Sequence, residues 1–507
     1  MAHSLWQILT TRAGSGRAIG APGRPWLDGA GLLALARDTL ATLNAAGIGA
    51  GERVALVLPN GPEAASAFVA LAAGTAAAPL NPAYKAEEFS FYLSDLAPKA
   101  LITLNGWETP AREVAAGLGI PVIGLETTPD GPAGGYRLDT GSLPTAAAAR
   151  PGPAAPEDAA LVLHTSGTTA RPKVVPLSGR NLAASAAHIA EALALGPEDV
   201  CLNIMPLFHI HGLIAAVLSS LEAGAAVCCT PGFNAFKFLD WLGTVRPTWY
   251  TAVPTMHQAI LLRARNHPEQ ARAAGLRFIR SSSASLPPQV MLELEEVFGA
   301  PVIEAYGMTE AAHQMASNPL PPRGRKPGSV GLAAGPEVAI MDDAGRLLPS
   351  GEIGEVVIRG PNVTVGYAGN PEANGRAFTE GWFRTGDQGR LDEEGYLFLT
   401  GRLKELINRG GEKISPLEVD VVLMDHPAVA QCVTFAMPHD MLGEEVAAAV
   451  VAHEGATATE QEIRDHCAVR LAAFKVPRKI LFLKEIPKGA TGKLQRIGLA
   501  RTLGLAD

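Results

Sequence analysis

Apolar and polar positions alternate along the first two thirds of the chain in a way that predicts strands followed by helices. Short apolar runs at residues 54–58, 100–103 and 200–205 predict buried strands, and turn residues 59–61 close the first of them. Alanine dominates residues 64–80, which predicts a small-residue helix packed inside the protein. Strands that alternate with helices are typical of α/β architecture with mainly parallel sheets flanked by helices.

The pattern changes in two later parts of the chain. Residues 126–158 are rich in Pro, Gly, Ala and Thr and predict a surface connection with little regular structure. Short strand-like pieces at residues 355–360 and 395–400 are bounded by Gly and Pro and predict an antiparallel β subdomain. A separate small α+β pattern follows them. We therefore predict a large N-terminal domain over residues 1–403 and a small C-terminal domain over residues 404–507.

Composition narrows the classes of protein to which this chain could belong. Its 42 basic and 50 acidic residues give a net charge of −8 with no run of five basic residues, which argues against a nucleic-acid partner. Five cysteines without a CxxC pair predict neither a disulfide framework nor a zinc site. The N-terminus lacks a secretory signal and no stretch predicts a membrane span, so we expect a soluble cytoplasmic protein. Nothing in the sequence predicts an oligomeric state.

The strongest local motif is TSGTTARPK at residues 165–173. It follows a strand-like run at residues 160–163 and precedes a helical stretch that starts at about Gly179. A hydroxyl-rich turn of this kind can aim backbone N–H and side-chain O–H groups at phosphate oxygens, and Lys173 adds positive charge. The motif is not the GxxxxGK[ST] P-loop, so a simple kinase or ATPase fold is not supported. Taken alone, the segment could also be a polar surface loop.

Together with four further motifs, this loop resembles the adenylate-forming superfamily, which comprises acyl-CoA synthetases, adenylation domains of peptide synthetases and luciferases. The four motifs are YGMTE at residues 306–310, GWFRTGD at residues 381–387, GRLKE at residues 401–405 and PKGATGK at residues 487–493. They follow the family's order, and the resemblance covers about residues 51–496. Ala170 and Val174 depart from the family because both stand where Gly is usual, and both could stiffen the loop.

The resemblance implies a two-step reaction in which a carboxylate attacks the α-phosphorus of ATP and the acyl group then passes to a thiol. It implies ATP, Mg²⁺ and coenzyme A as the small molecules involved, and coenzyme A is expected as the acceptor because no carrier domain follows in the sequence. Charge builds on phosphate oxygens in such a reaction, so catalysis is mainly positioning and electrostatic stabilisation. The small domain is expected to be mobile, with Lys404 as its hinge.

The resemblance also implies a role for individual residues. The nucleotide-binding set is Thr165, Ser166, Gly167, Thr168, Thr169, Lys173, Ser283, Tyr306, Gly307, Asp387 and Arg402. The catalytic set is Lys493, Thr309, Glu310 and His209. Tyr306 would stack on adenine, Asp387 would bind the ribose hydroxyls, and Glu310 would be the Mg²⁺ ligand. Lys493 would stabilise the charge that develops between the carboxylate and the α-phosphate.

The segments that match the family's acid pocket are rich in His and Ser. These segments are residues 205–212, 249–258, 280–286 and 310–315. A pocket for a long acyl chain should be apolar and open, whereas these residues suit a short acid whose second carboxylate needs donors. The predicted substrate residues are His209, His211, Ser282 and His313. With residues 406–413, the segments resemble plant and fungal oxalate–CoA ligases.

The favoured function is therefore an ATP-dependent ligase that activates a small dicarboxylate, oxalate first, and transfers it to coenzyme A with release of AMP and pyrophosphate. Malonate is an alternative substrate, and so is a medium-chain or aryl acid, because Phe208 and Trp249 could line an apolar pocket. The histidines could also be ordinary core residues. A catalytically inactive nucleotide-binding regulator is the alternative from another class, although Lys493, Glu310 and Asp387 are all present.

Overall fold

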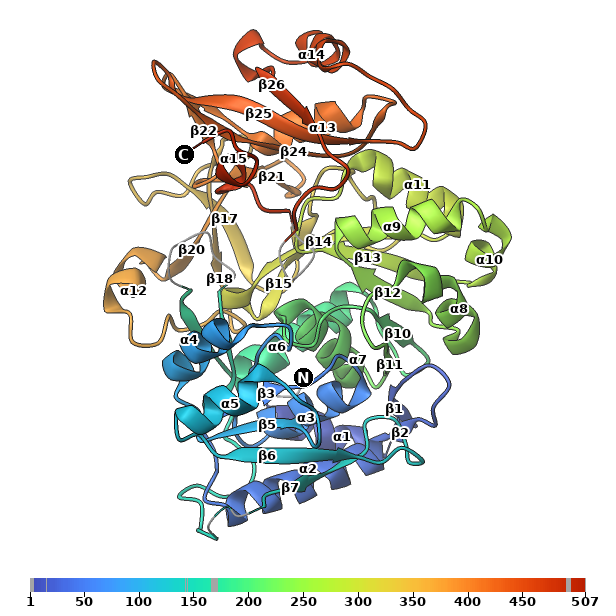
Figure 1. Ribbon diagram of the computed structural model, residues 1–507, viewed down its shortest axis with the longest axis vertical. Helices are drawn as coiled ribbons and strands as arrows, with labels where there is room; N and C mark the ends of the chain where they lie inside the picture. Colours follow the sequence, from blue (N-terminus) through green and yellow to red (C-terminus); the bar gives the residue numbers. More distant parts are fainter. Residues whose placement is uncertain are drawn as a thin grey trace.

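A computed structural model shows a large body with a small C-terminal domain at one end (Figure 1). The structure describes residues 4–14, 16–141, 143, 145–165, 172–488 and 494–506. Three sheets build the large body and a fourth builds the small domain. In the described ranges, no helix is both long and apolar enough to cross a membrane.

A seven-stranded sheet lies at the end of the body farthest from the small domain, with strand order β7-β6-β5-β3-β4-β8-β9 and antiparallel strands only at its edges (Figure 1). Its strands are β3 (Arg53–Val57), β4 (Ala76–Pro79), β5 (Ala100–Leu104), β6 (Val122–Thr127), β7 (Tyr136–Asp139), β8 (Ala159–His164) and β9 (Val174–Ser178). The helices around it are α1 (Leu5–Arg12), α2 (Gly29–Ala45), α3 (Pro62–Ala72), α4 (Ala86–Leu96) and α5 (Pro110–Gly117). Val54 and Leu56 face one hydrophobic core while Ala55 and Val57 face another, so β3 is apolar on both faces.

A nine-stranded sheet has the order β16-β15-β14-β13-β12-β10-β11-β1-β2 and is parallel from β14 to β1. Its strands are β1 (Arg17–Gly20), β2 (Leu27–Asp28), β10 (Val200–Asn203), β11 (Ala226–Cys229), β12 (Trp249–Ala252), β13 (Phe278–Ser282), β14 (Val302–Met308), β15 (His313–Ser317) and β16 (Leu332–Ala333). One face packs on α6 (Gly179–Ala192), the π-helix η1 (His211–Leu218) and α7 (Ser219–Glu222). The other packs on α8 (Ala235–Val245), α9 (Pro254–Ala264), α10 (Pro268–Ala273) and α11 (Pro288–Phe298). The 3₁₀ turn η2 (Thr309–Ala311) joins β14 to β15.

An antiparallel β subdomain and a C-terminal unit, whose sheet is antiparallel except where β26 pairs parallel with β25, follow in the chain. The β subdomain consists of β17 (Glu337–Met341), β18 (Gly354–Arg359), β19 (Phe378–Thr379), β20 (Trp382–Leu391) and β21 (Leu397–Arg402), with α12 (Pro371–Ala377). The C-terminal unit consists of β22 (Ile407–Arg409), β23 (Glu412–Ile414), β24 (Val429–His439), β25 (Gly443–Ala452) and β26 (Lys479–Phe482), with α13 (Pro416–Met424), α14 (Glu460–Ala468), η3 (Ala473–Lys475) and α15 (Leu499–Thr502). Lys404 lies between β21 and β22.

The predicted fold class is confirmed: helices flank mainly parallel sheets, and a β subdomain and a small α+β unit follow. Two details of the prediction are wrong. The segment 126–158 contains β7, whose four residues are too few to give a clear period of two. The alanine-rich helix ends at Ala72, and a short turn separates it from β4 at Ala76–Pro79.

Glu304 on β14 is a carboxyl group buried without a cationic partner among the described residues. Only 2% of it is exposed, one oxygen accepts a hydrogen bond of 2.8 Å from the Leu286 N–H, and the other has no partner in the described part of the chain. Burial raises the pKa of Glu304 to about 8. The folded protein therefore holds a proton on Glu304 at a pH where the unfolded chain has lost it.

We expect Glu304→Gln to raise stability at alkaline pH more than at acidic pH. The raised pKa makes the free energy of unfolding of the unsubstituted protein fall by up to about 1.4 kcal/mol per pH unit as pH rises from about 4.5 to about 8. Glutamine keeps the acceptor for Leu286 and removes this loss. Thermal unfolding at about pH 5.5 and about pH 8.5 measures the difference; an equal Tm difference at both values would contradict the assignment.

Candidate active site

The base of the predicted phosphate loop is closed by a pair of hydrogen bonds. The Thr165 N–H donates to the Lys173 carbonyl at 2.9 Å, and the Lys173 N–H donates to the Thr165 hydroxyl at 3.1 Å. The two residues follow β8 and precede β9, which pair antiparallel, and Ser178 at the end of β9 caps α6. The predicted nucleotide-binding residues Ser166, Gly167, Thr168 and Thr169 lie outside the described residues.

Lys173, Tyr367 and Glu310 form a cluster beside this loop. The Lys173 ammonium lies 4.2 Å from the centre of the Tyr367 ring, and the Tyr367 hydroxyl donates a hydrogen bond of 2.9 Å to Glu310 Oε1. Burial is the main cause that raises the pKa of Glu310, which is 6% exposed. Thr309 precedes Glu310 in η2 and is half-buried.

This cluster fits a magnesium ion. A buried carboxylate that burial makes harder to ionise is stabilised by a divalent cation, and Mg²⁺ commonly takes one or two carboxylates together with phosphate oxygens. No group of three or more His, Cys, Asp or Glu side chains that could hold a metal occurs within the described ranges. Glu310 would therefore share the ion with the phosphates of ATP.

A second cluster joins the β subdomain to β14. The Tyr306 hydroxyl donates to Asp387 Oδ2 at 2.5 Å, and Arg402 Nε lies 2.9 Å from Asp387 Oδ1. Asp387 and Arg402 are paired across β20 and β21, which fixes their side chains together. Three residues predicted for adenine and ribose are thus brought to one place, and Asp387 is only 5% exposed.

Gly307 allows β14 and β15 to approach closely behind these residues. The ladder shifts register between Tyr306 and Gly307, and a Cβ on Gly307 would lie 1.8 Å from the His313 carbonyl oxygen. Only glycine can occupy such a position. The close hairpin returns the chain from Glu310 in η2 to His313 at the start of β15. It therefore joins the cluster of Lys173, Tyr367 and Glu310 to a histidine predicted to bind the acid.

The predicted acid end of the site is the group of residues around His211, the first residue of η1. His211 Nε2 lies 2.6 Å from the Thr251 hydroxyl, and its Nδ1 lies 3.0 Å from the Ser283 hydroxyl. The His313 ring packs edge-on against it with centroids 5.0 Å apart. His209 Nδ1 accepts a hydrogen bond of 3.3 Å from the His211 N–H. A π-helical turn at this place is typical of functional sites.

The two neighbouring serines, which were assigned to different parts of the site, have different contacts. The Ser282 hydroxyl, predicted to face the acid, donates to the Ala305 carbonyl at 2.9 Å and is fully buried. Ser283, predicted for the nucleotide, is the serine that contacts His211. Its φ of +76° turns the chain at the end of β13, and for a non-glycine residue this is a strained conformation.

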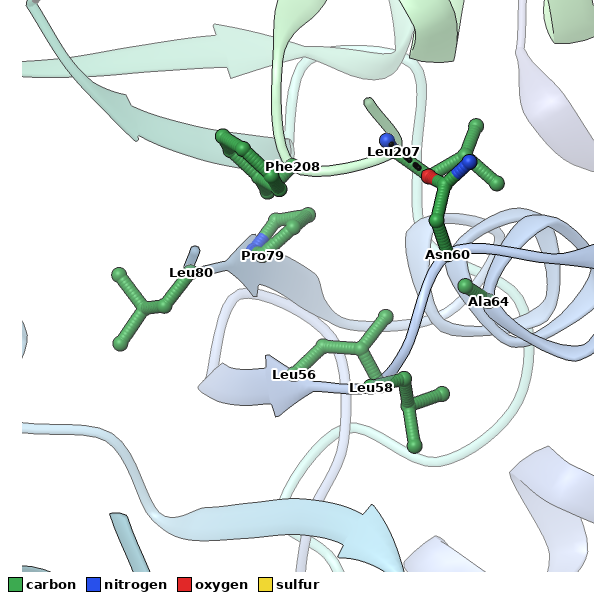
Figure 2. A pocket seen from close by; sticks show the side chains of 8 residues that line it. All are labelled: Leu56, Leu58, Asn60, Ala64, Pro79, Leu80, Leu207 and Phe208. Atoms are coloured by element: carbon green, nitrogen blue, oxygen red, sulfur yellow. Dashed lines mark hydrogen bonds between the residues drawn. The ribbon is translucent and has the colours of Figure 1, made fainter. Parts of the chain in front are cut away.

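The two apolar residues considered for a medium-chain acid lie in different surroundings. Trp249 is fully buried and stacks on Phe278 with centroids 5.3 Å apart. Figure 2 shows Phe208 beside Pro79 and Leu80, where the cavity measures about 10 Å³. A hydrogen bond of 2.8 Å from the Leu207 N–H to Asn60 Oδ1 closes its wall. Such a volume holds at most about one water molecule.

Sequence reasoning did not single out four residues that the structure brings to the site: Tyr367, Thr251, Arg280 and Gln314. A charged residue inside the strand FIRSS was a usable signal for Arg280, because arginine is rarely buried without a reason. Tyr367 lies in a loop and Thr251 lies in β12, and nothing in the sequence around them is unusual. Only their contacts identify them as site residues.

The segments that carry Lys404 and Lys493 meet near α13. Lys493 lies outside the described residues, but Lys488 and Leu494 on either side of it are paired. Arg496 bonds to Asp420 and lies 3.8 Å from Glu405, beside the predicted hinge. Lys404 is exposed. The pKa of Lys173 is lowered mainly by the burial of Lys173 itself, and the positive charge of Lys404 is the second cause.

Comparison with known proteins agrees with this geometry. The AMP-binding enzyme family matches residues 23–368, and the AMP-binding enzyme C-terminal domain matches residues 418–493. The chain is 50% identical to an oxalate–CoA ligase of Arabidopsis thaliana (89% of this chain, 88% of the relative) and 44% identical to an oxalate–CoA ligase of Saccharomyces cerevisiae (89% and 87%).

A solved structure supports the same placement. The ATP-bound MatB from Rhodopseudomonas palustris superposes with a TM-score of 0.87 at 32% identity and covers 99% of both chains. The matched family models, the identities and the clustered site residues agree with one another. The chain therefore belongs to the AMP-binding enzyme family of adenylate-forming acid–CoA ligases.

Proposed function

We propose that the protein is an AMP-forming oxalate–CoA ligase. It would join oxalate to ATP as oxalyl adenylate, release pyrophosphate, and then transfer the oxalyl group to coenzyme A with release of AMP. The observation that carries the proposal is the hydrogen-bonded polar group Thr251–His211–Ser283, which the β14–β15 hairpin joins to the cluster of Lys173, Tyr367 and Glu310. The relatives that are 44–50% identical support the same substrate.

The proposed roles on the nucleotide side follow from the two clusters. Asp387 would accept the ribose hydroxyls while Tyr306 and Arg402 hold its carboxylate in place. Lys173 and the donors of the loop would bind phosphate oxygens, and a Mg²⁺ ion on Glu310 would supply positive charge to the phosphates. Thr309 and Lys493 are proposed to contact the α-phosphate. His209, half-buried beside His211, is proposed to border the reacting carboxylate.

The acid side explains why a small diacid is favoured. Oxalate keeps one carboxylate charged while the other reacts, and burying a charge without partners costs several kcal/mol. Ser283, which His211 holds in place, and His313 beside it would supply donors for that carboxylate. A hydrocarbon chain would leave these polar groups desolvated and unpaired.

The mobile parts and the location of the protein are also proposed. We place the domain boundary at residues 403/404 and the hinge at Lys404, because β21 ends at Arg402 and β22 starts at Ile407. Rotation there would exchange Lys493 for the segment that lines the coenzyme A path. All five cysteines are buried free thiols, which fits a cytoplasmic location.

An acid panel tests the proposal. AMP release is measured with oxalate, malonate, hexanoate and benzoate, each with and without coenzyme A. Oxalate is expected to give the highest kcat/KM, and sustained AMP release is expected only with coenzyme A. A higher kcat/KM for hexanoate or benzoate would reject oxalate, and no AMP with any acid would favour the non-catalytic regulator.

A further inference from the structure

Arg280 is a buried cation that none of the roles above uses. It lies in β13 between Thr251 of β12 and Ile303 of β14, and its side chain has no exposed surface. Its Nη1 donates to the Thr251 hydroxyl at 3.4 Å and its Nη2 donates to Gln314 Oε1 at 3.1 Å, while its Nε has no partner among the described residues. An arginine that is completely buried normally has a carboxylate beside it.

No carboxylate in the described part of the chain pairs with Arg280. The neighbouring strand β14 carries one buried acid, Glu304, but its side chain lies on the opposite face of the sheet from Arg280. Side chains alternate along β13 and β14, so Glu304 lies with Ser281 and Val302 against α11, whereas Arg280 lies with Phe278 on the face covered by α6 and η1. Burial lowers the pKa of Arg280 only to about 9, so the guanidinium stays charged at neutral pH.

The contacts of Arg280 lead directly to the acid end. A guanidinium can only donate, so Thr251 must accept from it, which favours a Thr251 hydroxyl hydrogen directed at His211 Nε2. His211 then carries its proton on Nδ1 and donates to Ser283. The Ser283 hydroxyl, which is half-buried, is left to donate outward. Chains of hydrogen bonds polarise one another, so the buried charge strengthens the outward donor.

We propose that Arg280 is a specificity-determining residue, a buried positive charge that selects acids with a second anionic group by acting through Thr251, His211 and Ser283. The inference rests on the proposed function, because it names the group that balances the second carboxylate of oxalate. Arg280 is a positioning residue here, since the chain of contacts and not the guanidinium reaches the acid. An acid without a second charge gains nothing from it.

The test compares oxalate with acetate, a monoacid of similar size, in the full-length protein with ATP, Mg²⁺ and coenzyme A. Arg280→Met is expected to lower kcat/KM for oxalate at least about 100-fold and to change the inhibition constant of acetate against oxalate less than about threefold. Arg280→Lys keeps the charge and is expected to recover at least about tenfold of the loss. Arg277→Gln, at the residue just before β13 but paired with Asp199 at 2.8 Å, is the matched control and should keep the oxalate-to-acetate ratio.

Thermal unfolding separates this role from a structural one. Removing an unpaired buried charge should leave the Tm of Arg280→Met equal to or above that of the unsubstituted protein. The inference would be overturned if the Tm fell and if kcat/KM for oxalate and the affinity for acetate fell by the same factor. If Arg280→Met does not fold, the Arg280→Lys variant decides, because a loss of the oxalate preference despite the retained charge also overturns it. Failure of the unsubstituted protein to use oxalate would instead reject the proposed function.

Discussion

Replacing Lys493 by alanine is expected to abolish formation of the acyl adenylate while sparing the second half-reaction. An ammonium placed between the carboxylate and the α-phosphate offsets charge that develops only in the first step, and loss of one such group typically costs about 100- to 1000-fold in rate. Lys493 lies in the Gly-rich segment after Lys488, which suits a loop that enters the site in one conformation only. Oxalate-dependent pyrophosphate release measures the first step.

The second step is measured by supplying a preformed acyl adenylate and following the thioester. Lys493→Ala should consume it at a rate within a few-fold of the unsubstituted protein. Lys488→Ala is the matched control, because Lys488 is in the same segment and pairs with Glu485 at 3.4 Å instead. Equal losses in both half-reactions would contradict the assignment of Lys493 to the first step.

The second large effect is expected from Glu310→Gln. The substitution keeps the size of the side chain and removes the charge that would hold Mg²⁺, so kcat should fall about 100-fold and the Mg²⁺ concentration for half-maximal rate should rise. Tyr367→Phe is the matched comparison: it removes the 2.9 Å hydrogen bond to Glu310 but keeps the ring under Lys173. Its loss should be about tenfold or less.

A magnesium titration of the initial rate distinguishes the two variants. Glu310→Gln should need more Mg²⁺ and remain slow at saturation, whereas Tyr367→Phe should approach the unsubstituted rate. An unchanged Mg²⁺ requirement for Glu310→Gln would mean that the ion is held elsewhere. The measurement therefore tests the ligand itself and not only the importance of the residue.

The sequence motifs predicted that Tyr306, Asp387 and Arg402 gather at one place, because they identify the segments that carry these residues. Lys173 directly precedes β9, which pairs with β8, and Asp387 and Arg402 come together because β20 and β21 pair. The acid side was predictable only in composition. Its central contacts join His211 to residues 40 and 72 positions away, and no local pattern encodes such distances.

The different environments of Ser282 and Ser283 have a specific cause. Alternation along β13 places Ser282 by the pleat, but Ser283 leaves the strand with a positive φ, which the sequence does not announce in a residue other than Gly or Asn. Tyr367 was missed for a similar reason, because its hydrogen bond to Glu310 crosses 57 positions of the chain. Pairings of this kind follow from tertiary packing alone.

A competition experiment tests most directly whether the polar residues around His211 select a small diacid. The protein is given equal concentrations of oxalate and hexanoate with ATP, Mg²⁺ and limiting coenzyme A, and the acyl-CoA products are identified by mass spectrometry. The donors around His211 predict oxalyl-CoA as the dominant product. Hexanoyl-CoA without detectable oxalyl-CoA would contradict the account.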